Sequence, residues 1–328
     1  MEEQIDIHDF NKKFERKLQK IAEDPKIKKV NKDYINKFVE FCIVKENKKS
    51  SMTKDLYSIW FFAHNLNKDF KKANKNDFTK LILLLEKQKW TKQTKRVHRV
   101  SLKKFMKWLK GNNKFYPPEV EDIQTSRKNL GSYLPDEILS PKEVQMMIGS
   151  ATDIRDKTLI MFLAFTGTRI GEALNVKIKN CRFQETGEVI VLVNGKTGYR
   201  TIVSIPLSSA LANYIENGHP TKNPDDYLFM TNHNMTKGRT VVGKIFDSKL
   251  GKEREIGKTF WIPLGYAGAT KVLKNLAKKA GVVKKVSPHW FRRYAATQDA
   301  SYMSDRLMML KFGWATAVKK LREIKALK

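Results

Sequence analysis

The sequence predicts a mainly α-helical protein of two domains with one small β-hairpin. The chain has 328 residues, more than one small hydrophobic core needs and suited to two domains of ordinary size. Through most of the chain, apolar residues recur three and four positions apart, as they do on one face of a helix. Runs of β-branched residues typical of strands are confined to residues 188–207. These three observations set the fold class.

The first domain is expected over residues 1–116, as a small helical bundle. Four helical patterns are found there, at 31–47, 53–67, 76–88 and 91–111. The periodicity then lapses, and the Pro117–Pro118 pair is typical of a loop. We therefore expect a linker over residues 117–139.

The second domain is expected over residues 140–328, and its first helix has a clear start. Ser140 suits the N-cap, Pro141 the first helical position, and Glu143 the third position of a capping box. Residues 155–180 predict a buried helix, a Thr-Gly-Thr break and a second helix that begins near Arg169.

A hairpin is predicted from two β-branched runs, 188–193 and 201–207, joined by the segment NGKTGYR. Helical patterns return at 208–217 and from about residue 266 onward. Residues 235–260 are polar and punctuated by glycine, and they predict no clear element.

Charge points to a polyanionic partner. Lysine and arginine number 64 against 34 acidic residues, a net charge of +30. Residues 1–116 carry 30 of the basic and 14 of the acidic side chains, so both parts of the chain are basic. Such an excess favours nucleic acid as the partner, and an anionic membrane is the alternative.

A membrane span is not expected, because the most apolar run, residues 158–167, is far shorter than the roughly 20 residues that a bilayer requires. The N-terminus lacks an apolar signal core. The two cysteines, Cys42 and Cys181, are far apart and fit a reducing compartment without a thiolate metal site. We expect a cytoplasmic, nucleoid-associated protein.

The helix at 91–111 is the strongest candidate for contact with a polyanion. Its cations cannot all be buried, so at least one face must be strongly positive; a solvated charged face is the alternative interpretation. The candidate DNA-binding residues are Lys92, Lys95, Arg96, Arg99, Lys103 and Lys104.

Four segments of the second domain suit chemistry on a phosphodiester: TGTRIGEAL, NGKTGYR, SPHWFRRYAAT and LKFGW. Two guanidinium groups, from Arg169 and Arg292, could neutralise the extra negative charge of the transition state. Lys196, between two glycines, could protonate the leaving 5′ oxygen. His289 lies three residues before Arg292, on the same face of a helix. Taken singly, each of these residues is more often a cap, a turn residue or an ion-pair partner.

In this order the four segments resemble the tyrosine recombinase, or phage integrase, family, and their sequences are similar to those of archaeal-type and Xer-like members. The resemblance implies a helical, SAM-like core-binding domain and a catalytic domain that form a C-shaped clamp around double-stranded DNA. It also implies assembly into tetramers on DNA, with no metal or other cofactor. The implied catalytic residues are Arg169, Lys196, His289, Arg292 and Trp314, with Glu172 and Arg293 in support.

The sequence departs from the family at the nucleophile. Family members carry, shortly after the segment that holds Trp314, a tyrosine that attacks the phosphorus, and residues 315–328 contain none. Tyr302 is an alternative nucleophile, and Tyr294 is expected to pack beside the helix of Arg292. A truncated or frame-disrupted tail, a replaced nucleophile, and a relative that binds DNA without cleaving it all remain open.

Two classes of function therefore follow from the resemblance. One is a site-specific recombinase that cleaves and rejoins DNA through a 3′-phosphotyrosine; the other is a cleavage-deficient architectural or regulatory DNA-binding protein. A type IB topoisomerase would use the same residue types, but the compact two-domain size of the chain and the sequences of the four segments favour a recombinase. A basic RNA-associated protein is a further alternative, without a supporting aromatic motif.

Overall fold

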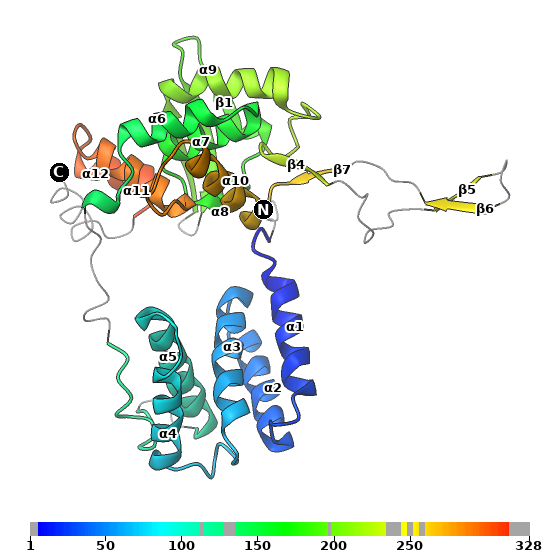
Figure 1. The fold of residues 1–328 in the computed structure, drawn as a ribbon, viewed down its shortest axis with the longest axis vertical. Coiled ribbons are helices and arrows are strands. Elements are labelled where there is room, and N and C mark those ends of the chain that lie inside the picture. The colour runs from blue at the N-terminus through cyan, green and yellow to red at the C-terminus, as the bar shows by residue number, and fades with distance from the viewer. Residues whose placement is uncertain are drawn as a thin grey trace. The chain divides into compact units, whose positions relative to one another are not determined.

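The structure is a computed structural model that describes residues 6–111, 115–126, 135–195, 198–233, 244–247, 252–255 and 260–314. Its contacts divide the chain into two compact units (Figure 1). One unit comprises Asp9–Ser132, and the other comprises Tyr133–Lys328 together with Met1–His8. The predicted class, mainly helical with small antiparallel sheets, is confirmed.

The first unit is a bundle of helices. Its described helices are α1 (Phe10–Glu23), α2 (Lys29–Val44), α3 (Lys49–Asn65), α4 (Lys75–Glu86) and α5 (Lys92–Leu109). Helix α3 packs against α1, α2 and α5. Aromatic rings fill the core, where Phe105 meets Phe38 edge-on with ring centres 5.3 Å apart. The four predicted helices are confirmed within a few residues; α1, whose apolar side chains are sparse among charged ones, is not among them.

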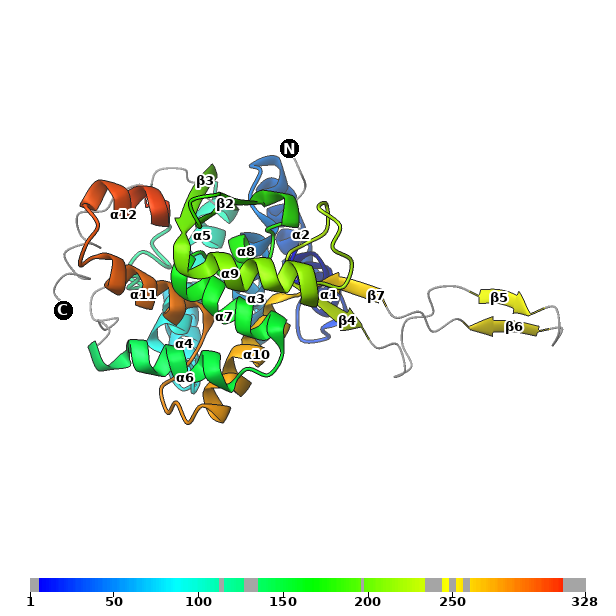
Figure 2. The ribbon, with the colours of Figure 1, turned by 90° about the horizontal axis from the view of Figure 1, so that it is seen from above.

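The second unit is built around helix α7. Its described α-helices are α6 (Pro141–Ser150), α7 (Ile154–Thr166), α8 (Ile170–Ala173), α9 (Ile205–Asn213), α10 (Tyr266–Lys279), α11 (Pro288–Asp299) and α12 (Asp305–Phe312). Helix α7 lies between α6 and α9 (Figure 2) and also packs against α11. The capping box predicted at Ser140 is confirmed, with the Glu143 amide donating to the Ser140 hydroxyl at 3.2 Å. The second helix predicted within 155–180 is shorter than expected, because α8 ends after one turn.

A three-stranded antiparallel sheet carries the predicted hairpin. Strand β2 (Val189–Gly195) lies between β1 (Cys181–Phe183) and β3 (Gly198–Ser204), and Val193 pairs with Arg200. The hairpin is confirmed, but its second strand ends before residue 207. Helix α9 takes over there, because Pro206 fits the first turn of a helix, where no backbone N–H is required.

Two further antiparallel pairs complete the described elements. Strand β4 (Met230–His233) pairs with β7 (Phe260–Pro263), and β5 (Lys244–Asp247) pairs with β6 (Lys252–Glu255). The last of these pairs lies within residues 235–260, for which the sequence predicts no element. Two short turns of 3₁₀-helix, Pro135–Glu137 and Ile178–Asn180, and a π-helical turn, Tyr214–Gly218, complete the chain's described secondary structure.

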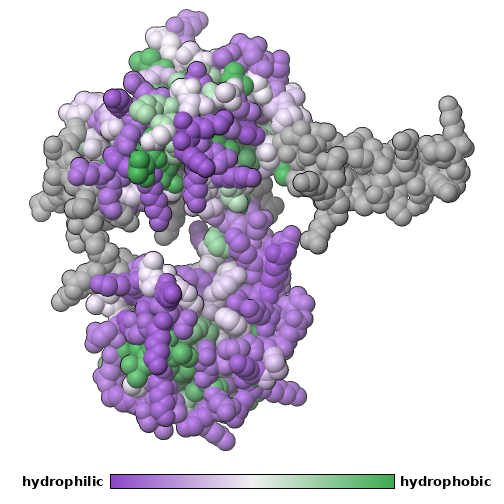
Figure 3. All heavy atoms as spheres, in the orientation of Figure 1, coloured by the Kyte–Doolittle hydropathy of each residue, from purple (hydrophilic) through white to green (hydrophobic). Residues whose placement is uncertain are grey.

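The segment before α1 packs on the second unit. The Ile7 carbonyl accepts a hydrogen bond from the first amide of α10, on Tyr266, at 3.1 Å, and the His8 and Tyr266 rings lie 4.5 Å apart. Figure 3 shows hydrophilic residues over much of the visible surface of each unit. None of the helices in the described ranges combines the length and the apolar composition that crossing a membrane demands.

Candidate phosphate-binding site

The site is built on the turn between α7 and α8. The buried Thr166 hydroxyl donates to the Phe162 carbonyl at 2.6 Å and lies 3.0 Å from the Thr168 hydroxyl, which secures the end of α7. Gly167 follows in the left-handed region, at a φ of 60°. A Cβ there would lie 2.4 Å from the Phe312 ring and 2.9 Å from Ala295, so only glycine fits. This turn aims the next residue, Arg169, at the start of α8.

Arg169 and Glu172 are tied to each other in two ways. The Arg169 amide donates to Glu172 Oε2 at 2.8 Å, and its guanidinium donates to Oε1 at 2.7 Å. Glu172 is 3% exposed, whereas the Arg169 side chain is 38% exposed. The buried carboxylate of Glu172 therefore holds Arg169 in place, while the charged side chain of Arg169 remains partly exposed to solvent.

Arg200, which the sequence analysis did not select, completes this ion pair from the hairpin. Its Nη2 donates to Glu172 Oε2 at 2.6 Å, and its Nε donates to the Lys311 carbonyl at 2.8 Å. Burial by itself would raise the pKa of Glu172, but the hydrogen bonds from Arg200 and Arg169 outweigh it and lower that pKa. The sequence offers little signal for this role, because β3 is a mixed strand, GYRTIVS, in which Arg200 is one of several polar residues.

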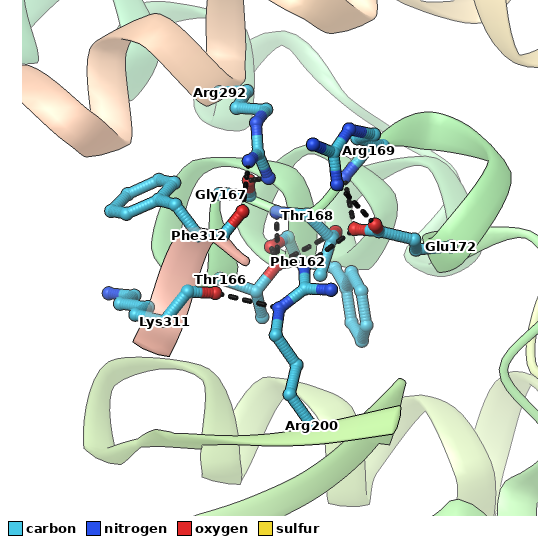
Figure 4. Close-up of polar contacts among 10 residues, drawn as sticks. All are labelled: Phe162, Thr166, Gly167, Thr168, Arg169, Glu172, Arg200, Arg292, Lys311 and Phe312. Atoms are coloured by element: carbon cyan, nitrogen blue, oxygen red, sulfur yellow. Dashed lines mark hydrogen bonds and ion pairs between the residues drawn. The ribbon is translucent and has the colours of Figure 1, made fainter. Parts of the chain in front are cut away.

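Arg292 reaches the same turn from α11. One nitrogen, Nη1, donates to the Gly167 carbonyl at 2.7 Å, and Nη2 donates to the Phe312 carbonyl. Figure 4 shows Arg292 and Arg169 on one side of the turn and Arg200 reaching in from β3. Arg292 is only 5% exposed. Its pKa is lowered to about 9, first by burial and then by the charges of Arg169 and Arg200, while Glu172 opposes the shift.

Charge at the turn is unbalanced. Arg169 and Arg200 bind the carboxylate of Glu172, and Arg292 donates to the neutral Gly167 and Phe312 carbonyls. An arginine keeps its proton at neutral pH, so this cluster, which we call the arginine cluster, has a net positive charge. An anion with several oxygen acceptors, such as a phosphate, would balance it.

The other predicted site residues lie around this cluster. His289 is exposed on the first turn of α11, and the Arg293 guanidinium lies 4.7 Å over the Trp290 ring. The Trp314 ring stacks on Phe312, whose carbonyl Arg292 binds, with ring centres 4.9 Å apart. Lys196 lies outside the described residues. The structure thus brings Arg169, Glu172 and Arg292 together and connects Trp314 to them through Phe312.

The surroundings of Tyr302 and Tyr294 do not favour either residue as a nucleophile. The Tyr302 hydroxyl donates to the buried carboxylate of Asp299, which also pairs with Lys311. Partial burial, together with the hydrogen bond and the charge of Asp299, raises the pKa of Tyr302. Tyr294 is buried, and that burial raises the pKa of its hydroxyl too. Both shifts disfavour the phenolate that would attack phosphorus.

The cations of α5 differ in their availability. Glu86 binds both Lys95 and Arg99, and Asp55 binds Lys104 at 2.7 Å. Arg96 donates to the Thr125 carbonyl at 2.7 Å, and the buried Lys103 donates to the Glu121 carbonyl at 2.6 Å. Lys92 is exposed and forms no ion pair with the described residues.

Comparison with known proteins identifies relatives across most of the chain. The probable integrase/recombinase protein MJ0367 of Methanocaldococcus jannaschii is 26% identical over 258 residues, which are 74% of this chain and 75% of the relative. The tyrosine recombinase XerA of Pyrococcus horikoshii is 25% identical over 272 residues, 82% and 80% of the two chains.

Solved structures share the fold at lower identity. The XerH site-specific recombinase in its post-cleavage complex with palindromic difH substrate has a TM-score of 0.61 at 17% identity, covering 99% of this chain and 94% of the other. A lambda integrase dimer bound to a COC′ core site has a TM-score of 0.64 at 12% identity, covering 89% and 76%. The model of the phage integrase family matches residues 137–301, which include Arg169, Glu172, Arg200 and Arg292. The chain belongs to the phage integrase family.

Proposed function

We propose that the chain binds duplex DNA and that the arginine cluster holds the phosphodiester at which a strand is cut and rejoined. One observation carries this proposal: three guanidinium groups, two bound to the Glu172 carboxylate and one bound to neutral backbone carbonyls, leave a positive charge at the Gly167 turn. The net charge of +30 supports DNA as the source of the phosphate. The relatives named as recombinases and the neighbours solved on DNA support the same substrate.

Arg169 is the residue that would contact the phosphate most openly, because it is the more exposed of the two predicted arginines. Arg292 would contribute mainly from beneath, by fixing the Gly167 and Phe312 carbonyls and by adding its charge. His289, exposed on the first turn of α11, and Trp314 would supply further hydrogen bonds to the phosphate oxygens. Glu172 would hold Arg169 in place.

The proposed reaction conserves the phosphodiester. A tyrosine oxygen attacks phosphorus and forms a bond to the 3′ phosphate, while the bond from phosphorus to the 5′ oxygen breaks. The tyrosine hydroxyl gives its proton to water, and the departing 5′ oxygen gains one from Lys196. Attack by another 5′ hydroxyl on the phosphotyrosine reverses these steps and joins the new strand. Exchange between two duplexes requires several copies of the chain, so we also propose self-association on DNA.

A second candidate function is DNA binding without cleavage. Two observations favour it: residues 315–328 contain no tyrosine, and the Tyr302 hydroxyl is bound by Asp299. Such a protein would keep the phosphate contact and act as an architectural or regulatory factor.

A covalent-trapping assay separates the two candidates. The chain is incubated with a labelled pool of nicked duplexes of randomised sequence and then denatured in SDS. A DNA adduct that resists SDS, and that disappears in Arg169→Ala, would establish the cleaving enzyme, and peptide mapping would locate its tyrosine. Binding without an adduct would establish the second candidate.

Salt dependence tests the DNA contact that both candidates share. If about six phosphates are neutralised, affinity should fall roughly a thousandfold between 50 and 200 mM salt. An affinity that does not change with salt would contradict both functions.

A further inference from the structure

Arg200 joins three separate elements of the second unit. It lies on β3, donates through Nε to the Lys311 carbonyl at the end of α12, and donates through Nη2 to Glu172 on α8. Its side chain is 10% exposed, so these bonds form where water competes little. The planar fork of an arginine makes these two bonds from two separate nitrogens, whereas a lysine offers a single nitrogen.

The hairpin packs directly against this pair of side chains. A Cβ on Gly195 would lie 2.2 Å from Glu172 Oε1 and 3.2 Å from Arg200 Nη1. The last residue of β2 therefore has to be glycine if the carboxylate and the guanidinium are to keep their places. Since Gly195 pairs with Gly198 across the hairpin, the position of the Glu172–Arg200 pair also sets the position of the hairpin end.

One donor of Arg200 is left over. Nη1 is buried and has no hydrogen-bond partner among the described residues. An unsatisfied buried donor costs free energy, and an ion pair that served stability alone would be expected to avoid it. Arg200 thus lies where Nε and Nη2 can hold the Lys311 carbonyl and Glu172, although its Nη1 is left without a hydrogen-bond partner among the described residues (Figure 4).

We propose that Arg200 is a positioning residue of the phosphate site: through Glu172 it orients Arg169, and through the Lys311 carbonyl it fixes the end of α12 before Trp314. It does not itself touch the phosphate. This inference rests on the proposed function, since the site that Arg200 orders is the phosphate site described there.

The test measures the affinity of the full chain for inorganic phosphate by isothermal titration calorimetry at constant ionic strength. Arg200→Gln should weaken binding by about tenfold, because Glu172 would lose one of the partners that align it with Arg169. Arg200→Lys should not restore the affinity, although it keeps the charge. Arg182→Gln is the matched control, since Arg182 is an exposed arginine on β1 of the same sheet, and it should change affinity by less than about twofold.

A double-mutant cycle separates positioning from simple charge. In a Glu172→Gln background the effect of Arg200→Gln should largely disappear, because Arg200 acts through that carboxylate. Additive effects, or full rescue by Arg200→Lys, would overturn the inference.

Two controls keep the outcomes distinct. Phosphate binding that is lost in Arg169→Ala but unchanged in Arg200→Gln would overturn the role of Arg200 alone, whereas a wild-type chain that binds no phosphate would overturn the proposed function with it. If the Arg200 variants do not fold, Gly195→Ala replaces them. This variant keeps every charge and pushes a methyl group against Glu172 Oε1, so an unchanged phosphate affinity in a folded Gly195→Ala protein would equally contradict the inference.

Discussion

Helix α5 and the arginine cluster are both rich in cations, but the carboxylates that bind these cations differ in burial, since Glu172 is 3% exposed and Glu86 is 44% exposed. On α5, single acids or carbonyls satisfy most of the cations, as Glu86 does for Lys95 and Arg99. In the cluster, Glu172 binds Arg169 and Arg200, and Arg292 donates to the Gly167 and Phe312 carbonyls. The difference shows that the same pairing of one acid with two cations matters more to stability when it is buried than when it is exposed.

The comparison predicts its largest effect at the two carboxylates. Glu172→Ala should lower the free energy of unfolding by about 3–5 kcal/mol, because it leaves buried guanidinium groups without a counter-charge. Glu86→Ala is the control from α5, where the carboxylate is 44% exposed, and should cost about 1 kcal/mol or less. Urea unfolding followed by circular dichroism measures both. Equal losses of unfolding free energy would mean that the buried Glu172 stabilises the protein no more than an exposed ion pair does.

Within the cluster, substitutions of the two predicted arginines should have different effects on stability and on phosphate binding. Arg292→Ala should lower the free energy of unfolding by about 2–3 kcal/mol, since it frees the buried Gly167 and Phe312 carbonyls. Arg169→Ala should cost about 1 kcal/mol, because its side chain is half-exposed, yet it should weaken phosphate binding more. Chemical unfolding and phosphate titration of the same two proteins check this. A stable Arg292→Ala protein would show that Arg292 is held in place by its surroundings and contributes little to the fold.

Much of this site could be predicted from the sequence, and the reason lies in the local motifs. Thr166–Glu172 folds as one continuous turn and helix start, so the places of Arg169 and Glu172 follow from neighbouring residues. Arg292 was predicted from the segment SPHWFRRYAAT, in which it follows His289 by three residues. The helices of both units follow in the same way from apolar spacing.

The parts that could not be predicted depend on long-range packing. Arg200 looks like any polar residue of a hairpin until β3 is placed beside α12, 111 positions further along the chain. The burial of Lys103 depends on the carbonyls of Glu121 and Ile123, which belong to a segment without periodicity. The return of Ile7 to the start of α10 likewise joins residues that no local pattern connects.

The effect of pH on the free energy of unfolding should be intermediate in size and should come from Glu172 in the arginine cluster. The pKa of Glu172 in the folded protein is lowered from its ordinary value of 4.5. Its contribution to stability is therefore complete above that value and is lost as the pH falls through the lowered pKa. Unfolding measured from pH 7 to pH 3 should show a loss of stability in the wild type that is smaller in Glu172→Gln. An identical pH profile in both proteins would place the acid-sensitive groups elsewhere.

The smallest effect should be found among the cations of α5 themselves. Lys92→Ala removes an exposed charge, so it should reduce the slope of log affinity for DNA against log salt concentration by about 0.9, the value of one phosphate contact. Lys103→Met removes a buried charge that is bound to the Glu121 carbonyl. It should leave the slope unchanged, because an ammonium already held inside the unit releases no counterion from DNA. Fluorescence anisotropy over a series of salt concentrations measures both slopes, and a larger change for Lys103→Met than for Lys92→Ala would mean that DNA draws Lys103 out of its buried position.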